Sequence, residues 1–245
     1  MKRLFISLAI LAGISLSSCN DSFLEKTPVT DLTENNAFNS YDNFKAFMWP
    51  CYEMFTNNTI RTSLQGFGQD GQYKGDMAAG YFQQKYESGY NEFAYQTVAS
   101  VASGNGWDFK SFIRRVNIML SHIDNSSMTE AQKDHWRAVG YFFHSFWYME
   151  LIDRFGDVPW VDQVLQEDSP EAYGPRVDRK TVADKVLERL QWAEQNIGNF
   201  TSQDGDNTIN QDCVRAVISR FGLREGTWRK YHELGDAEKY LHHGR

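Results

Sequence analysis

Cys19 is the residue whose sequence surroundings point most directly to a chemical reaction. Lys2-Arg3 is followed by a mainly apolar run of 13 residues, Leu4–Leu16, and Leu16-Ser17-Ser18 stand directly before the cysteine. A positive start, an apolar centre and small residues before a cleavage point are typical of a secretory signal peptide. Cleavage before Cys19 makes its thiol part of the first residue of the mature chain.

The order Leu-Ser-Ser-Cys resembles the lipobox of bacterial lipoproteins, in which the cysteine is diacylated. A plain signal peptide with an incidental cysteine is the alternative. The apolar run is shorter than the roughly 20 residues that a spanning helix needs, and no later stretch of the sequence is long and apolar enough. We therefore predict a signal peptide over residues 1–18, lipidation at Cys19 and a membrane-anchored tether over residues 19–39.

The net charge limits the class of binding partner, and the cysteine content limits the number of disulfide bonds. Cleavage removes Lys2 and Arg3 and no acid, which takes the formal net charge from −7 to −9. Such an acidic chain argues against a nucleic-acid partner and against broad electrostatic adhesion to anionic membranes. Cys51 and Cys213 lie in helical apolar patterns, so we expect buried, unpaired thiols; a single bridge between them is the alternative.

Motifs for a cofactor or for catalysis do not occur in the sequence. His122, His135 and His144 lack the spacing of metal ligands, and His144 is expected in the core. The run Asp204-Gly205-Asp206-Asn207 lacks the spacing and closing glutamate of a calcium-binding EF-hand. Neither a Gly-rich phosphate loop nor a Gly-x-Ser-x-Gly motif is found. We therefore predict no metal, no cofactor and no catalytic residue.

Helical periodicity covers most of the chain from residue 40 onward. The expected helices run from Ser40 to Phe55, from Trp107 to Ile123, from Thr129 to Gly156, from Asp178 to Gly198 and from about Asn210, with a last start near Asp236. Pro50 is expected to kink or divide the first, and Thr129 with Gln132 forms a capping box. Alternating hairpin patterns are missing. We predict an all-α fold of paired antiparallel helices with long inserted loops. Such pairs suit a tetratricopeptide-like solenoid, although their irregular spacing does not by itself identify tetratricopeptide repeats.

The longest expected loop, over residues 57–106, combines eight glycines with many aromatic residues. Long insertions in compact domains are usually functional or disordered, and disorder disfavours aromatic residues. We therefore expect a folded, ring-rich loop region.

The helix expected over residues 136–155 and its exit carry the most specific pattern. Arg137-Ala138 lead into Phe155-Gly156-Asp157-Val158-Pro159, which resembles the signature of the SusD/RagB family of outer-membrane nutrient-uptake lipoproteins. Other short segments that resemble the family occur along the chain in the order found in that family, from Cys19 and Phe23-Leu24-Glu25 to Arg215-Ala216. The resemblance covers almost the whole mature chain, although members usually continue well beyond this length. Residues 40–245 are thus expected to form the N-terminal, helical part of a SusD-like protein.

The resemblance implies a surface protein that captures a glycan, or sometimes a peptide-type nutrient, and sits on a TonB-dependent transporter. In that family the helices generally face the transporter, and ligand contacts generally come from inserted loops and from a large second half of the protein. Flat rings suit the apolar faces of sugars, and amides and carboxylates suit their hydroxyl groups. The expected ligand contacts are therefore in the ring-rich loop: Tyr73, Asp76, Tyr81, Phe82, Tyr86 and Tyr90.

Other readings stay open. Each of these rings can instead seal the loop onto the helices, as buried aromatic residues commonly do. The protein as a whole can be a scaffold that binds only the transporter, or a surface glycoside hydrolase with two facing carboxylates. Asp157 is expected to be structural, capping the turn after Gly156.

Overall fold

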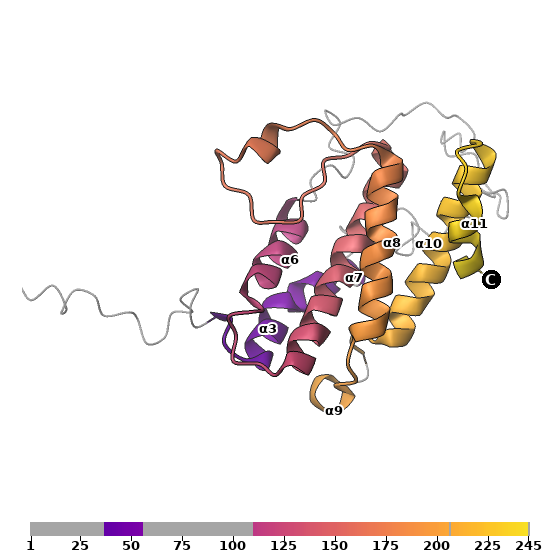
Figure 1. Ribbon diagram of the computed structural model, residues 1–245. Coiled ribbons are helices and arrows are strands. Elements are labelled where there is room, and N and C mark those ends of the chain that lie inside the picture. Colours follow the sequence, from indigo (N-terminus) through magenta and orange to yellow (C-terminus); the bar gives the residue numbers. More distant parts are fainter. Residues whose placement is uncertain (1–36, 56–109, 206, 245) are drawn as a thin grey trace, which may run out of the picture. The chain divides into compact units, whose positions relative to one another are not determined.

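A computed structural model describes residues 37–55, 110–205 and 207–244 (Figure 1). The predicted signal peptide and almost all of the predicted tether lie outside these ranges. Phe38, near the end of the predicted tether, is buried and packs against the rings of Phe44, Phe47 and His122 at centroid distances of 5.4, 4.7 and 4.3 Å. The helical body therefore begins at Phe38.

The described residues form helices joined by turns and loops, which confirms the all-α prediction. In the labels of Figure 1, the elements are α3 Tyr41–Met48, the 3-10 helix η2 Trp49–Phe55, α6 Lys110–His122, α7 Glu130–Phe155, η4 Pro170–Tyr173, α8 Arg179–Asn196, α9 Thr201–Asp204, α10 Gln211–Tyr231, α11 Ala237–Leu241 and η5 His242–Gly244. Within these residues, β-type pairing is limited to an isolated antiparallel bridge between Val158 and Val177. Of the described helices, none is long and apolar enough to cross a bilayer.

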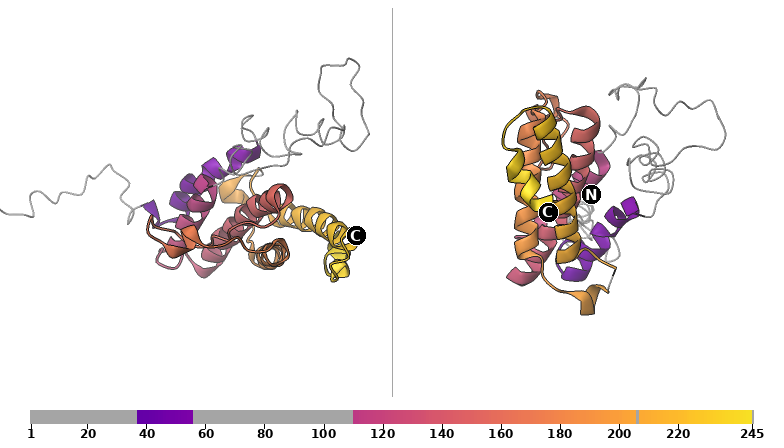
Figure 2. Two further views of the ribbon diagram at one scale, coloured as in Figure 1. Left: turned by 90° about the horizontal axis from the view of Figure 1, so that it is seen from above. Right: turned by 90° about the vertical axis from the view of Figure 1, so that its right-hand side faces the viewer.

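Successive long helices run in alternating directions and pack on their neighbours. Helix α7 packs against α6 and α8, and α10 packs against α8 and the α11–η5 segment. Figures 1 and 2 agree that α8 lies between α7 and α10. This stack of antiparallel helices is the arrangement that the periodicity predicts.

The helices begin where short polar side chains cap them. Ser40, Asp178 and Asn210 each accept a hydrogen bond from the backbone N–H three residues later. Thr129 and Gln132 form the predicted capping box of α7. These bonds satisfy N–H groups that have no partner inside the helix. At Pro50 the α-helix gives way to η2, as expected for a residue that lacks a backbone N–H.

Helix α7 is the central element. Over its 26 residues, nearly all side chains from His135 to Ile152 are buried, and Gly156 ends it with φ of 67°. A positive φ favours glycine, which has no Cβ to clash. The prediction of a central helix that stops at Gly156 is confirmed.

Helix α10 extends to Tyr231, ten residues beyond Phe221, the last inward-facing residue that periodicity identifies. The added length buries charged residues instead of apolar ones. Glu225 and Arg229 are 1% and 0% exposed, and Arg229 Nε lies 2.8 Å from Glu225 Oε1. An apolar-periodicity search cannot detect a buried face made of an ion pair.

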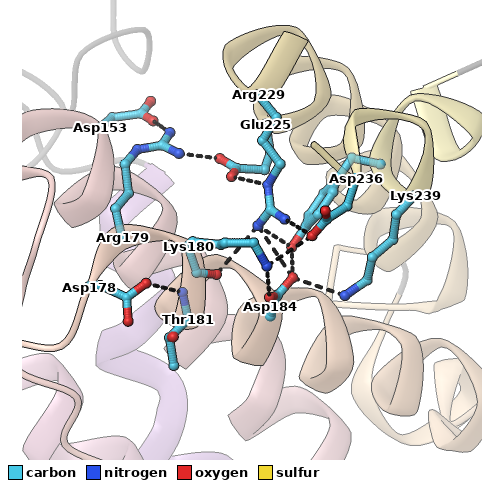
Figure 3. A network of polar contacts seen from close by, with 11 residues as sticks. Asp153, Asp178, Arg179, Lys180, Thr181, Asp184, Glu225, Arg229, Asp236 and Lys239 are labelled. Carbon is cyan, nitrogen blue, oxygen red and sulfur yellow. Dashed lines mark hydrogen bonds and ion pairs between the residues drawn. The ribbon is translucent and has the colours of Figure 1, made fainter. Parts of the chain in front are cut away.

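Arg229 is the centre of a polar network that joins α8, α10 and α11 (Figure 3). Its guanidinium also donates to Asp236 Oδ2 at 3.0 Å, to Asp184 Oδ1 at 3.3 Å and to the Tyr240 hydroxyl at 3.0 Å. Partial burial alone would raise the pKa of the Asp184 carboxyl, but bonds from Tyr240 and Lys239 and the charge of Arg229 lower it to about 2. The network fixes the α11 hairpin to the helix pair α8–α10.

Two glycines of α10 let the α11–η5 segment approach closely. A Cβ added at Gly222 would lie 2.6 Å from the Tyr240 backbone oxygen, and one at Gly226 would lie 2.6 Å from the Leu241 side chain. The contact at Gly222 involves backbone, which cannot move aside as a flexible side chain can.

We expect Arg229→Ala to destabilise the protein by about 3–5 kcal/mol, because it leaves the buried Glu225 carboxylate without this partner. Urea unfolding followed by circular dichroism measures the free energy of unfolding. Arg215→Ala is the control, since Arg215 is an exposed arginine of the same helix that pairs with Glu194. A loss in Arg229→Ala no larger than in the control would contradict the role of the network.

Gly222→Ala is expected to lower the free energy of unfolding by about 1–3 kcal/mol, because the added methyl group overpacks the contact with α11. The better helix propensity of alanine reduces this loss. Hydrogen exchange at α11 should rise at the same time, because this segment has to move away. At Gly174, φ is −69° and an added Cβ meets nothing closer than 3.5 Å, so Gly174→Ala is the control. Unchanged exchange at α11 in Gly222→Ala would disprove the close-packing argument.

Candidate functional site

The residues predicted to act chemically lie outside the described ranges. These are Cys19 and the six expected ligand contacts: Tyr73, Asp76, Tyr81, Phe82, Tyr86 and Tyr90. They stay predictions. The described residues nevertheless contain a cavity next to the point where the chain enters the segment 56–109.

This aromatic cavity has a volume of about 520 Å³ and lies between η2, α7, α10 and the turn before α10. Its apolar wall comes from rings and aliphatic side chains, and its polar groups gather at one side. The lining residues are Tyr52, Phe55, Phe142, Phe146, Met149, Glu150, Asn207–Asn210, Cys213, Ala216, Val217 and Arg220. An apolar pocket with a few polar groups is the usual form of a small-molecule site.

The change from α3 to η2 positions the two rings on one side of the cavity. The ring of Tyr52 meets Phe143 edge-on at 5.1 Å, and that of Phe55 meets Phe146 edge-on at 6.0 Å. Edge-to-face packing at these distances is favourable for aromatic pairs and holds the rings in place. Phe55 is also the last described residue before the ring-rich segment, so that segment starts at the cavity wall.

A hydroxyl and a carboxyl are the best-defined polar groups of the cavity. The Tyr52 hydroxyl accepts a hydrogen bond from the Ile209 backbone N–H at 3.2 Å, and burial raises the pKa of Tyr52 to about 12. Burial also raises the pKa of the Glu150 carboxyl, although Arg224 Nη1, 3.8 Å from Glu150 Oε1, opposes this. Tyr52 thus ties the turn at Ile209 to η2, and Glu150 is a poorly solvated acid.

Glu150 is the single carboxylate among the described residues that line this cavity. Hydrolysis of a glycoside requires two facing carboxyl groups. The described walls therefore suit binding: rings against the apolar face of a ligand, and Glu150, Arg220 and backbone groups for its polar edge.

The burial of Cys51 and of His144 agrees with the expectation from the sequence, whereas Cys213 is only half-buried and lines the aromatic cavity. Cys51 is buried and Cys213 half-buried, and both are free thiols; burial raises the pKa of Cys51 to about 12. His144 is fully buried, and its Nε2 donates to the Val161 carbonyl at 2.9 Å. Burial holds its pKa well below the ordinary range. The described residues bring no three His, Cys, Asp or Glu side chains together as a metal site.

Asp157 is structural, as predicted, but its partner is different. Instead of capping the turn after Gly156, its Oδ1 accepts from the Arg179 backbone N–H at 2.9 Å, 22 residues along the chain. Together with Asp178, which accepts from Thr181 N–H at 2.9 Å, it caps the start of α8. Asp157 therefore joins the end of α7 to the start of α8.

Asp204 belongs to a buried clasp. Its side chain is 4% exposed and lies 3.3 Å from Lys45 Nζ and 3.6 Å from His135 Nε2, and it accepts a hydrogen bond from the Tyr41 hydroxyl. Desolvation lowers the pKa of His135, against the opposing charge of Asp204. The clasp fixes the one-turn helix α9, where the sequence predicts only a turn, to α3 and α7.

Sequence reasoning missed the aromatic cavity because its walls come from three distant segments. In the sequence, Phe142 and Phe146 belong to the apolar pattern of the helix expected from Thr129 to Gly156, and nothing marks them as lining a cavity. Glu150, an acid within the apolar run of a central helix, is the one available signal.

Comparison with known proteins finds a SusD-like family, described as starch-binding and associating with the outer membrane, whose model matches residues 22–223. No curated protein matches the chain.

Solved structures have a similar fold. A SusD-like protein of Bacteroides fragilis aligns with a TM-score of 0.59 at 17% identity, over 89% of this chain and 40% of its own. A SusD-like carbohydrate binding protein of Bacteroides vulgatus gives 0.56 at 20%, over 83% and 44%. A SusD homologue of Bacteroides thetaiotaomicron gives 0.56 at 15%, over 82% and 38%. The chain thus spans less than half the length of each of these relatives.

The family match covers most of the chain, from the segment after Cys19 to the middle of α10, and the helical fold agrees with it. The chain therefore belongs to the SusD-like family.

Proposed function

We propose that this protein captures a glycan at the outer membrane, without cleaving it, and passes it to a TonB-dependent transporter. The match to a family described as starch-binding carries the proposal. The aromatic cavity supports it, because it offers rings and a few polar groups of the kind that sugars require.

The glycan site in this proposal combines the aromatic cavity with the ring-rich segment that follows Phe55. The cavity supplies Tyr52, Phe55 and Glu150 from the helical body. The segment supplies the expected contacts: Tyr73, Asp76, Tyr81, Phe82, Tyr86 and Tyr90. A pocket of about 520 Å³ is within the range that binds a small ligand.

Membrane retention in this proposal depends on Cys19. The diacylated thiol holds the chain at the outer membrane, and residues 20–37 act as a linker. Linkers of this length reach only tens of ångströms, which keeps the helical body beside a membrane partner. The transporter contacts the helical face, in line with the family resemblance.

Phe55→Ala and Tyr81→Ala should each weaken glycan binding by about tenfold, the cost of removing one well-packed aromatic contact. Isothermal titration with a panel of neutral oligosaccharides measures the dissociation constants. Tyr173→Ala is the control, because Tyr173 is 80% exposed and does not line the cavity. Chromatography of the same samples detects any cleaved product. Released sugar would establish hydrolysis, and unchanged binding in both variants would rule out this site.

Cys19→Ala should leave binding in solution intact but abolish membrane retention, because the variant has no thiol to acylate. Fractionation of cells followed by immunoblotting compares the membrane and soluble pools. Cys213→Ala is the matched control, since it also removes a free thiol. A Cys19→Ala protein that stays in the membrane fraction would contradict lipid anchoring.

A further inference from the structure

A second pocket, of about 680 Å³, lies between the end of α7, the first residue of α8 and the C-terminal half of α10. We call it the Arg179 pocket. It shares no lining residue with the aromatic cavity. Figure 3 shows two of its residues, Asp153 and Arg179, beside the buried Glu225.

The walls of the Arg179 pocket carry more guanidinium groups than carboxylates. Among the described residues that line it, three are arginines, Arg154, Arg179 and Arg224, and one is an acid, Asp153. Two further carboxylates, Glu150 and Glu225, pair with these arginines from behind, but their side chains are only 7% and 1% exposed and do not line the pocket. At the described surface of the pocket, guanidinium groups therefore outnumber carboxylates by three to one.

Arg179 keeps hydrogen-bonding capacity toward the pocket. Its Nη1 donates to Glu225 Oε2 at 2.6 Å, whereas its Nη2 lies 3.8 Å from Asp153 Oδ1, beyond hydrogen-bonding distance. Asp153 instead pairs with Arg224 Nη1 at 2.5 Å. Nη2 can thus donate to an incoming carboxylate, for which the planar guanidinium has the matching geometry.

Aromatic rings stand next to this guanidinium. The Arg179 Cζ lies 4.4 Å from the centroid of the Trp228 ring, a cation–π contact that fixes its plane. Tyr231, three residues further along α10, lines the pocket with 82% of its surface exposed. An exposed ring beside a held guanidinium offers a flat apolar surface and a carboxylate-binding group side by side.

We propose that the Arg179 pocket binds an acidic saccharide, with the ligand carboxylate on Arg179 and a sugar face on Tyr231. The pocket extends the proposed glycan capture to a second site and gives it a ligand class. Substitutions in the Arg179 pocket do not alter the lining of the aromatic cavity, so an experiment can contradict one proposal without contradicting the other.

The probes are trigalacturonic acid and its methyl ester, which share one sugar skeleton and differ in charge. Isothermal titration of the full chain should show the acid binding at least about tenfold more tightly than the ester, since a charge-assisted hydrogen bond is lost in the ester. Tyr231→Ala should weaken binding of the acid about five- to tenfold, the contribution of one aromatic contact. Tyr173→Ala, the control with an equally exposed ring outside the pocket, should leave it unchanged.

Circular dichroism and thermal unfolding confirm that Tyr231→Ala is folded, as expected for an exposed side chain. Equal affinity for acid and ester, no binding of the acid at millimolar concentration, or full binding in Tyr231→Ala would each overturn the proposal.

Discussion

Helix α7 is buried around nearly its whole circumference, and that constraint organises the fold. A helix with one apolar stripe needs a partner on one side only, but α7 has to be covered on all sides. The element η2 and helix α6 pack on one part of it and α8 on another, and α10 reaches it as well. The aromatic cavity lies along this helix, and the buried residues Phe142, Phe146 and Glu150 line it.

The far end of the helical stack is held by a charged network in addition to close packing, such as that of the Tyr240 ring on Phe221. Four side chains accept hydrogen bonds from Arg229. They are the carboxylates of Glu225, Asp236 and Asp184 and the hydroxyl of Tyr240. Glycines at positions 222 and 226 bring α11 close enough for these bonds to form. Buried ion pairs contribute less to net stability than their strength suggests, but they penalise wrong registers strongly. Here they fix the position of a five-residue helix that is too short to be stable alone.

Local chemistry in the sequence predicts helix boundaries well. Ser40, Thr129 with Gln132, Asp178 and Asn210 act as the caps that their residue types indicate, and Pro50 ends α3. The same reasoning fails where the partner is remote or the buried face is polar. Asp157 bonds a backbone group 22 residues away, and the second half of α10 buries Glu225 and Arg229 beside glycines. The cavity is formed by residues near positions 52, 146 and 209, and no sequence pattern links such distant positions. The resemblance carried by Phe155–Pro159 indicates the family, which residue spacing alone does not.

Two separate sets of hydrogen bonds join the two ends of the connection from α7 to α8. Asp157 accepts from Arg179 N–H, and Val158 and Val177 exchange backbone hydrogen bonds at 3.1 and 2.9 Å. These bonds hold the helix pair in register at the base of the connection, and Pro159, Val161 and Gln163 add hydrogen bonds to α6 and α7 through their carbonyl groups. The entropy of closing a loop changes only slowly with its length once its ends are fixed. Insertions in this connection are therefore expected to disturb the helix pair least between Gln166 and Arg176, where nearly all side chains are exposed.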